Sequence, residues 1–432
     1  MSLGRWLTPI VVITVFMGVL GTMYLAYVSD PVKNLHDFPV LLVDLDTGAT
    51  TPAGQQPPAG AQIVAGLQSG LDGSGIDLQI VDSATADEHL RTGKAYGAIT
   101  IPAGFSTALR DYAGAAVQAR EVQRPHILVQ TNPRSGSFAS SVVQRVSNDA
   151  LQQANAVVGK QLLDAVSAQL PPAESTQSAQ LSGVARTALA APIDIVTSPY
   201  RPLPDGTGQG LSAFIFTMIL LLAGFTGAMT VNSIIDSTLG YAPTEYGPMF
   251  WHHPPAETSR LRTLAIKWAV ITAAAPIIAA VYLAIAHLLK MPLEHPVGLF
   301  LYSTVAIIAV GVTALSILAA VGTSGVLVCL LLFVVLGLPS SGGTVPLEAS
   351  PRFFSVLADF EPMHQIYLAV RALLYFDADL SAGLAHGLIF TVIGLLIGVT
   401  LGAGTTHWYD SRGMHRTHRT TETEARTPEL VS

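Results

Sequence analysis

The chain has 432 residues, of which 50% are hydrophobic and only 12% carry a charged side chain. Soluble globular domains contain about 25% charged residues, so the composition excludes an ordinary soluble protein and predicts a membrane protein. The formal net charge of −7 shows no basic excess of the kind that binds nucleic acid, and the single cysteine, Cys329, excludes an intramolecular disulfide.

The first membrane-length segment lies at the N-terminus. Residues 6–28 carry no charge and are long enough to cross the roughly 30 Å hydrocarbon core of a bilayer. A signal peptide is the alternative, but its apolar core would be shorter and would end at a small-residue cleavage site. This segment ends with Tyr24, Tyr27 and Val28, which favours an uncleaved transmembrane anchor over residues 1–28.

Residues 29–210 have the pattern of a water-soluble domain. Apolar runs typical of strands alternate with stretches typical of helices, and this alternation predicts an α/β fold. The predicted strands are 40–45, 77–81, 96–101 and 126–130, with a further extended piece at 193–202. The predicted helices are 61–71, 84–92, 105–112 and a long amphipathic helix at 137–170, and a Gly/Pro-rich loop is predicted at 47–60.

The second half predicts a five-helix membrane domain over residues 211–406, with a tail at 407–432. Its apolar segments are 211–231, 264–288, 297–321, 325–338 and 384–406. Together with the anchor they predict a polytopic α-helical membrane protein of six transmembrane helices, with the α/β domain between helices 1 and 2. Basic residues gather near 260–267 and in the tail, so both termini are expected in the cytoplasm and the α/β domain outside the plasma membrane.

The stretch 339–383 is neither a clean membrane span nor an ordinary loop. Serines and glycines end the preceding helix, prolines delay the next one, and apolar aromatic residues then return. The pattern predicts an interfacial or re-entrant external cap of the membrane helices, and a long loop with two amphipathic helices is the alternative. The cap motif comprises Ser341, Gly342, Gly343, Pro346, Phe353, Phe354 and Arg371.

Three glycines, Gly394, Gly398 and Gly402, recur at every fourth position of the last apolar segment. Residues at this spacing share one face of a helix, and small residues there let a neighbouring helix approach closely. The pattern leaves open whether that neighbour belongs to the same chain or to a second copy.

The predicted cytoplasmic loop 236–262 combines aromatic, histidine and basic side chains. Residue type alone would allow a metal site, but Pro254 and Pro255 break the helical spacing that paired ligands need. An amphipathic elbow at the membrane surface is therefore favoured. Its candidate partner-binding residues are Tyr246, Trp251, His252, His253 and Arg260.

The sequence contains no G-x-x-x-x-G-K-[ST], G-x-S-x-G or H-E-x-x-H motif. The apolar segments also contain almost no ionisable residues, which disfavours a proton- or ion-coupled carrier. We therefore expect no enzyme, and no catalytic, cofactor or metal site.

Several short motifs resemble the YhgE/Pip-like (phage infection protein) family. Residues 39–49 (PVLLVDLDTGA) resemble the start of that family's external domain, and residues 96–106 (YGAITIPAGFS) are similar to its strand followed by Ile-Pro-x-x-Phe-Ser. Residues 341–346 (SGGTVP), the Phe pair after Pro351 and Arg371 look like the motif before its last span. Residues 362–364 (PMH) depart from the family's usual Leu-Pro-x-Thr/Ser-Tyr pattern.

The order of one span, a large external domain and five spans resembles the ABC type-2 permease superfamily, in the branch that includes fungal nitrosoguanidine-resistance proteins. The resemblance implies a multi-pass plasma-membrane protein with a transport or export role, and we expect lipophilic or cell-envelope compounds as its substrates. We expect a homodimer in contact with membrane lipid and no nucleic acid partner. Because such permeases dock an ATPase at this elbow, a separate ATPase subunit is a candidate partner. The alternative is a non-transporting surface protein, either a phage receptor or a secretion scaffold.

Overall fold

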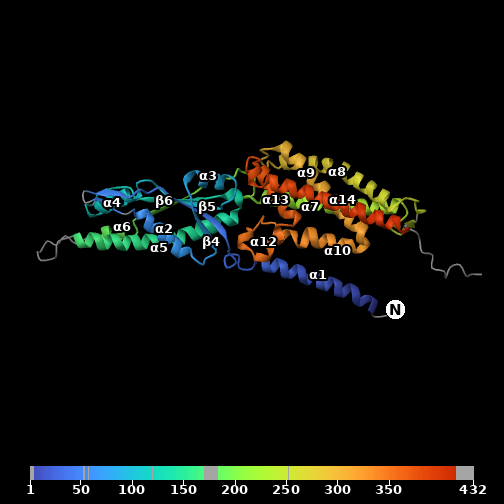
Figure 1. Cartoon of the computed structure of the whole chain (residues 1–432), viewed down its shortest axis with the longest axis horizontal. Coiled ribbons are helices and arrows are strands. Elements are labelled where there is room, and N and C mark those ends of the chain that lie inside the picture. Colours follow the sequence, from blue (N-terminus) through green and yellow to red (C-terminus); the bar gives the residue numbers. More distant parts are fainter. Residues whose placement is uncertain are drawn as a thin grey trace, which may run out of the picture.

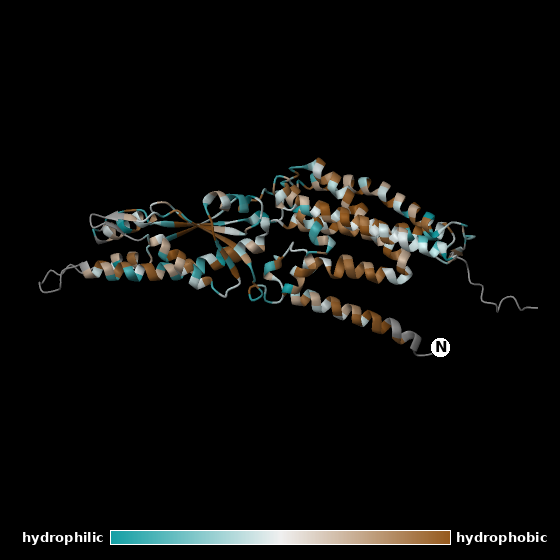
Figure 2. Cartoon of the chain, in the orientation of Figure 1, coloured by the Kyte–Doolittle hydropathy of each residue, from teal (hydrophilic) through white to brown (hydrophobic). Residues whose placement is uncertain are grey.

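The computed structural model describes residues 4–51, 54–56, 58–118, 120–169, 183–251 and 253–414. An α/β domain lies at one end of the molecule and a bundle of long helices at the other (Figure 1). Hydrophobic residues predominate along the long helices, whereas hydrophilic residues are more frequent in the α/β domain and the loops (Figure 2). The division agrees with the apolar segments of the sequence.

The α/β domain is built on a five-stranded mixed sheet of order β4-β1-β5-β6-β7. Strand β1 lies parallel between β4 and β5, while β6 runs antiparallel to β5 and parallel to β7. The predicted α/β region between the first two spans is therefore confirmed. The strands are β1 (Phe38–Asp44), β4 (Ile76–Ile80), β5 (Gly97–Ile101), β6 (His126–Thr131) and β7 (Asp194–Pro199).

Helices cover both faces of the sheet because successive strand residues point to opposite sides. Val40 and Leu42 pack into the larger core with α2, α4 and α5, whereas Leu41 and Val43 pack against α3. The helices are α2 (Ala59–Leu71), α3 (Ser83–Arg91), α4 (Phe105–Val117), α5 (Ser137–Gln169) and α6 (Gly183–Ala190). The predicted last residue of the long helix, Leu170, lies outside the described residues.

The prediction of a loop without regular structure at 47–60 was wrong in detail. The segment contains a two-stranded hairpin, β2 (Ala49–Thr51) and β3 (Gly54–Gln56), and the first residues of α2. Strands of three residues are too short to produce a recognisable alternation of apolar and polar residues, so the sequence showed only the turn-forming composition.

Five helical stretches within the described residues are long and apolar enough to cross a membrane, which makes the chain a multi-pass membrane protein. They comprise the apolar part of α1 (Gly4–Val28), α7 (Leu211–Thr238), α8 (Arg260–Leu288), Pro296–Ser340 and α14 (Leu384–Ser411). The sequence predicted six separate segments. Two of these, 297–321 and 325–338, fall within the single stretch Pro296–Ser340, because short helical turns join them without a break.

That stretch folds back on itself. Helix α9 (Pro296–Val321) ends at Gly322, whose φ of 77° is incompatible with a continuing α-helix. The turn η2 (Gly322–Ser324) leads into α10 (Gly325–Leu330), the π-helical turn η3 (Leu331–Val335) and α11 (Gly337–Ser340). The Cys329 Sγ lies 3.8 Å from the Ala314 carbonyl oxygen, so α10 returns alongside α9.

The stretch 339–383 contains one exposed helix and one buried helix. In α12 (Arg352–Ala358) the side chains of Phe353 and Val356 are exposed. In α13 (Pro362–Tyr375), by contrast, most residues are buried against α7, α9 and α14. The interfacial description therefore suits α12, whereas α13 is inserted among the long helices. Short turns η4 (Leu347–Ala349) and η5 (Leu380–Ala382) flank them.

Helix α1 stands apart from the other long helices and is exposed along most of its length. Its last turns are tied to the rest of the chain by Tyr24, whose hydroxyl donates to the Val334 carbonyl (3.1 Å), and by Tyr27. The Tyr27 hydroxyl lies 2.7 Å from the Thr344 hydroxyl and accepts from the Val345 backbone N–H at 3.0 Å. The attachment of α1 is thus concentrated at one end.

Candidate functional site

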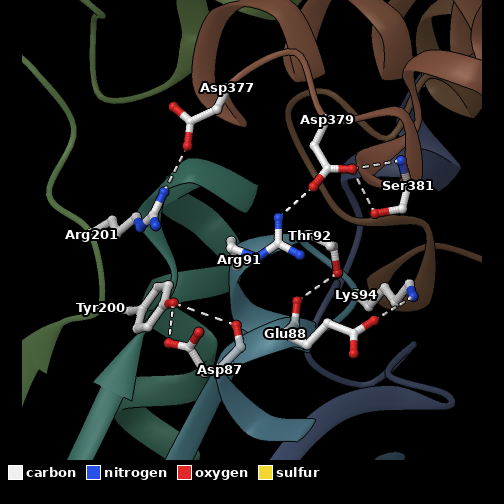
Figure 3. Close-up of polar contacts among 10 residues, drawn as sticks. All are labelled: Asp87, Glu88, Arg91, Thr92, Lys94, Tyr200, Arg201, Asp377, Asp379 and Ser381. Carbon is white, nitrogen blue, oxygen red and sulfur yellow. Dashed lines mark hydrogen bonds and ion pairs between the residues drawn. The ribbon is translucent and has the colours of Figure 1, made fainter. Parts of the chain in front are cut away.

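The α/β domain is docked on the bundle by ion pairs at the loop after α13. Figure 3 shows Arg91, at the end of α3, directed at Asp379, and Arg201, after β7, directed at Asp377 (2.9 Å). The Asp379 carboxylate also accepts from the Ser381 hydroxyl (2.7 Å) and backbone N–H (2.8 Å). These Ser381 hydrogen bonds, followed by Arg91, lower the pKa of Asp379 to about 2, so the carboxylate stays ionised.

A second group of contacts holds the end of α3 in place (Figure 3). The Tyr200 hydroxyl donates to the Asp87 carboxylate, and the Thr92 hydroxyl donates to the Glu88 carbonyl at 2.7 Å. The Lys94 Nζ lies 3.7 Å from the Glu88 carboxylate. The orientation of Arg91 toward the bundle is therefore supported from within the α/β domain.

Further docking contacts lie along the stretch after α11. The Tyr96 hydroxyl donates to the Glu348 carboxylate at 2.7 Å, and the His36 backbone N–H donates to the Glu348 carbonyl at 2.8 Å. The Arg134 guanidinium donates to the Tyr375 carbonyl at 2.6 Å. Burial and the Glu348 carboxylate raise the pKa of Tyr96 well above its usual value, so its hydroxyl remains a donor.

Between these contacts lies a polar cavity of about 250 Å³, which we call the junction chamber. It is formed by the α/β domain, the loop after α11 and one face of α13. Its lining residues are Pro39, Gly93, Lys94, Tyr96, Gly342, Leu347, Glu348, His364, Tyr367, Leu368 and Arg371. The His364 Nδ1 donates to the Ser341 carbonyl at 2.9 Å, and burial lowers the pKa of His364 to about 4, so this imidazole is neutral.

The opposite face of α13 borders an apolar cavity of about 260 Å³, which we call the apolar cleft. It lies among α9, η3, α13 and α14. Its lining residues are Ala309, Val310, Phe333, Phe360, Pro362, Gln365, Ile366, Phe390, Thr391, Ile393, Gly394 and Ile397. A Cβ atom at Gly394 would meet no other heavy atom within 4 Å. Gly394 therefore widens the cleft, and the exposed side chains of Phe360 and Ile397 mark its outer edge.

A third cavity, of about 590 Å³, lies at the end of the bundle away from the α/β domain. Beside it the Lys267 ammonium, 4% exposed, donates to the Asn232 side-chain oxygen (2.8 Å) and the Asp236 carboxylate (2.7 Å). In the sequence, Lys267 belongs to the basic residues near 260–267 that predict the orientation of the chain. The signal that could have revealed this buried pair was a single lysine inside the apolar run 264–288.

The residues of the predicted cap motif are divided among different environments. Gly342 and Arg371 line the junction chamber, and Phe354 packs edge-on against Tyr27 with ring centroids 5.9 Å apart. A Cβ atom at Gly343 would lie 2.9 Å from Cγ of Phe214 in α7, which explains the glycine. Ser341 and Pro346 are buried, whereas Phe353 is exposed. The residues of the cap motif therefore lie in several different environments and do not form a single binding site.

The glycine stripe brings α14 close to α9 and α8 within the same chain. A Cβ atom at Gly398 would lie 2.9 Å from the Thr313 Cα, and one at Gly402 would lie 2.7 Å from the Trp268 ring. Gly394 makes no such approach. Gly398 and Gly402 therefore serve intramolecular packing, whereas Gly394 belongs to the apolar cleft.

The elbow 236–262 contains a hairpin of β8 (Thr244–Tyr246) and β9 (Met249–Trp251). Trp251 is 57% exposed and His253 is also exposed, while His252 lies outside the described residues. Arg260 contacts the C-terminal end of α14. Its backbone N–H donates to the Asp410 carboxylate at 2.9 Å, and its guanidinium lies 5.0 Å from the centroid of the Tyr409 ring.

Two motifs of the family resemblance meet at Asp46. Its carboxylate accepts from the backbone N–H of Ser106 (3.0 Å), in the first turn of α4, and of Gly60 (3.1 Å) in α2, and from the Ser106 hydroxyl. Burial favours the neutral carboxyl, but the hydrogen bonds from Ser106, Gly60 and Gly48 outweigh it and lower the pKa of Asp46. This anion caps two helix N-termini, so these motifs have a structural role.

Comparison with known proteins gives one match. Residues 8–398 match the model of a family described as a protein of unknown function, DUF3533. Neither a curated protein nor a solved structure matches the chain. The comparisons thus show no link to the YhgE/Pip-like family or to ABC type-2 permeases.

Proposed function

We propose that this chain, which belongs to the DUF3533 family of proteins of unknown function, is a permease-like export protein for lipophilic or cell-envelope compounds in the plasma membrane. The observation that supports this proposal is the apolar cleft. A cavity lined by Phe, Ile and Val side chains stays dry and favours an apolar occupant, and this one reaches the lipid-facing side of α14 through Ile393 and Ile397.

The volume of the apolar cleft limits the size of the group that it can hold. Its volume of about 260 Å³ is below the roughly 300–1,000 Å³ of pockets that enclose drug-sized ligands. The cleft therefore suits an alkyl chain or a small ring system.

The proposed topology has six crossings. The stretch Pro296–Ser340 contains 45 residues, which as a straight helix of 1.5 Å per residue would extend about 68 Å, twice the thickness of a hydrocarbon core. A hairpin that crosses twice accounts for this length and supports both termini on one side of the membrane, and the basic residues near 260–267 and in the tail favour the cytoplasmic side. A reporter fused after Pro255 should then report the cytoplasm, and one fused after Asp205 the outside. The reverse pattern would contradict the proposed orientation.

The proposed partners are a second copy of the chain and a separate ATPase subunit. The exposed Met249, Phe250 and Trp251 in the β8–β9 hairpin offer an apolar contact surface on the elbow. Because the sequence has no phosphate-binding loop of the G-x-x-x-x-G-K-[ST] type, nucleotide hydrolysis would come from such a partner.

The test of export compares two glycine substitutions in α14. Gly394→Leu fills the apolar cleft, whereas Gly404→Leu adds the same side chain at an exposed position where a Cβ atom also meets nothing within 4 Å. Cells lacking the protein should accumulate a panel of lipophilic dyes that carry an alkyl chain, and the wild type and Gly404→Leu should restore efflux. Gly394→Leu, expressed at the same level, should not.

Equal dye accumulation with and without the wild-type protein, across the whole panel, would refute export. Tight binding of a phage or a secretion protein to the full-length chain, unaffected by Gly394→Leu, would then favour the surface-protein alternative.

A further inference from the structure

The junction chamber contains a cation that the described part of the chain does not neutralise. The ion pairs of the described residues, taken to 4.0 Å, do not include Arg371. Its Nε is buried and has no hydrogen-bond acceptor among those residues. A guanidinium with an unused donor in a buried setting requires an acceptor, because desolvating a charged donor without one is costly.

The guanidinium of Arg371 is held in place by aromatic rings. Its central carbon lies 5.3 Å from the centroid of the Phe376 ring and 5.6 Å from that of Tyr367. Cation–π contacts at these distances hold the guanidinium beside the rings without neutralising its charge. Arg371 is therefore oriented before any ligand binds.

The other polar groups of the chamber define the charge of its ligand. Lys94 adds a second cation, which faces Glu88 at 3.7 Å on an exposed surface. Glu348 is the carboxylate of the chamber and already accepts from the Tyr96 hydroxyl. His364 is neutral because burial lowers its pKa to about 4, and its Nδ1–H donates to the Ser341 carbonyl. Among the residues that line the chamber, the two cations Arg371 and Lys94 exceed the one carboxylate, Glu348, whereas Glu88 lies outside this lining.

We infer that the junction chamber is a binding site for an oxyanion group, with Arg371 as its principal ligand and Lys94 as a second cation. The planar guanidinium matches the geometry of a phosphate or carboxylate, to which it can donate two parallel hydrogen bonds. The source of the group is either the head of an anionic lipid or a free anion. This site lies on the face of α13 opposite the apolar cleft, and the inference does not depend on export.

The experiment measures binding to the purified full-length protein in nanodiscs of zwitterionic phosphatidylcholine. The probes are inorganic phosphate, dodecyl phosphate and uncharged dodecanol, each followed by calorimetry. We expect dodecyl phosphate to bind more tightly than dodecanol, and Arg371→Gln to weaken its binding by about ten-fold or more. Arg371→Lys should retain part of the affinity. Arg352→Gln, which changes an exposed arginine of the same stretch, should leave it unchanged.

The arms of the experiment separate the two sources. Binding of both phosphates with similar affinity identifies a free-anion site, whereas binding of dodecyl phosphate alone identifies a lipid headgroup. Equal affinity for dodecyl phosphate and dodecanol, or an Arg371→Gln protein that binds dodecyl phosphate as the wild type does, would overturn the inference. Because Gly394→Leu alters only the cleft, loss of dye efflux in that variant with intact phosphate binding would separate the two proposals.

Discussion

Substituting alanine for two glycines of the same helix face should have opposite effects on stability. A Cβ atom at Gly398 would lie 2.9 Å from the Thr313 Cα, whereas ordinary van der Waals contact begins at 3.4 Å. The helices must therefore separate by 3.4 − 2.9 = 0.5 Å at a backbone atom, which cannot rotate away. Overpacking of this kind costs about 1–3 kcal/mol.

The matched variant is Gly394→Ala, one helical turn earlier, where the new methyl group meets nothing within 4 Å. Both substitutions gain the same helix propensity of about 0.5–1 kcal/mol, so the difference between them isolates the packing cost of about 1–3 kcal/mol. Thermal unfolding of the full-length protein in detergent, followed by intrinsic fluorescence, should show a lower midpoint for Gly398→Ala and an unchanged or higher one for Gly394→Ala. Equal midpoints, or the reverse order, would refute close packing of α14 on α9.

Three further predictions concern polar contacts. Lys267→Met removes the cation from the buried Asp236 carboxylate and should destabilise the bundle by about 3–5 kcal/mol, and the double variant with Asp236→Leu should recover most of the loss in thermal midpoint. Hydrogen bonds from Ser381, followed by Arg91, lower the pKa of Asp379 from 3.8 to about 2, so its ionised form stabilises both the turn at Ser381 and the docking ion pair fully above about pH 4, and this contribution is lost as the pH falls toward 2. Limited proteolysis of the junction should show this dependence, and Asp379→Asn should abolish it. Tyr27→Phe removes the hydroxyl contacts to Thr344 and Val345 and should cost about 0.5–1.5 kcal/mol, seen as a lower midpoint, whereas Tyr112→Phe, whose hydroxyl lies 3.5 Å from the Ala188 carbonyl, should change it little.

Hydrophobic patterning was sufficient to predict much of the fold. Strand β1 was recognisable because Val40–Val43 are apolar on both faces, which a sheet covered by helices on both sides requires. Helix α5 was predicted from the spacing of its apolar residues and from the absence of proline. The sequence predicted 297–321 and 325–338 as two separate spans. In the structure the short turn η2 at Gly322 joins them, so they form one continuous helical stretch.

The candidate sites were harder to predict because they arise from long-range contacts. Arg91 and Asp379 are separated by 288 positions in the sequence, and no local pattern connects them. Arg371 was identified as part of a motif, but its position in the junction chamber depends on docking of the α/β domain. The burial of α13 could not be read from composition, since exposed and buried amphipathic helices have the same periodicity.

The docking contacts also impose an order of assembly on the newly made chain. The sheet is complete once β7 has been synthesised, at Pro199, yet the surface that receives the domain includes Glu348, Tyr375 and Asp379, which follow much later. During that interval Arg91, Tyr96 and Arg134 have none of these acceptors. The α/β domain can therefore fold early, but it can reach its final position only after the ribosome has passed η5.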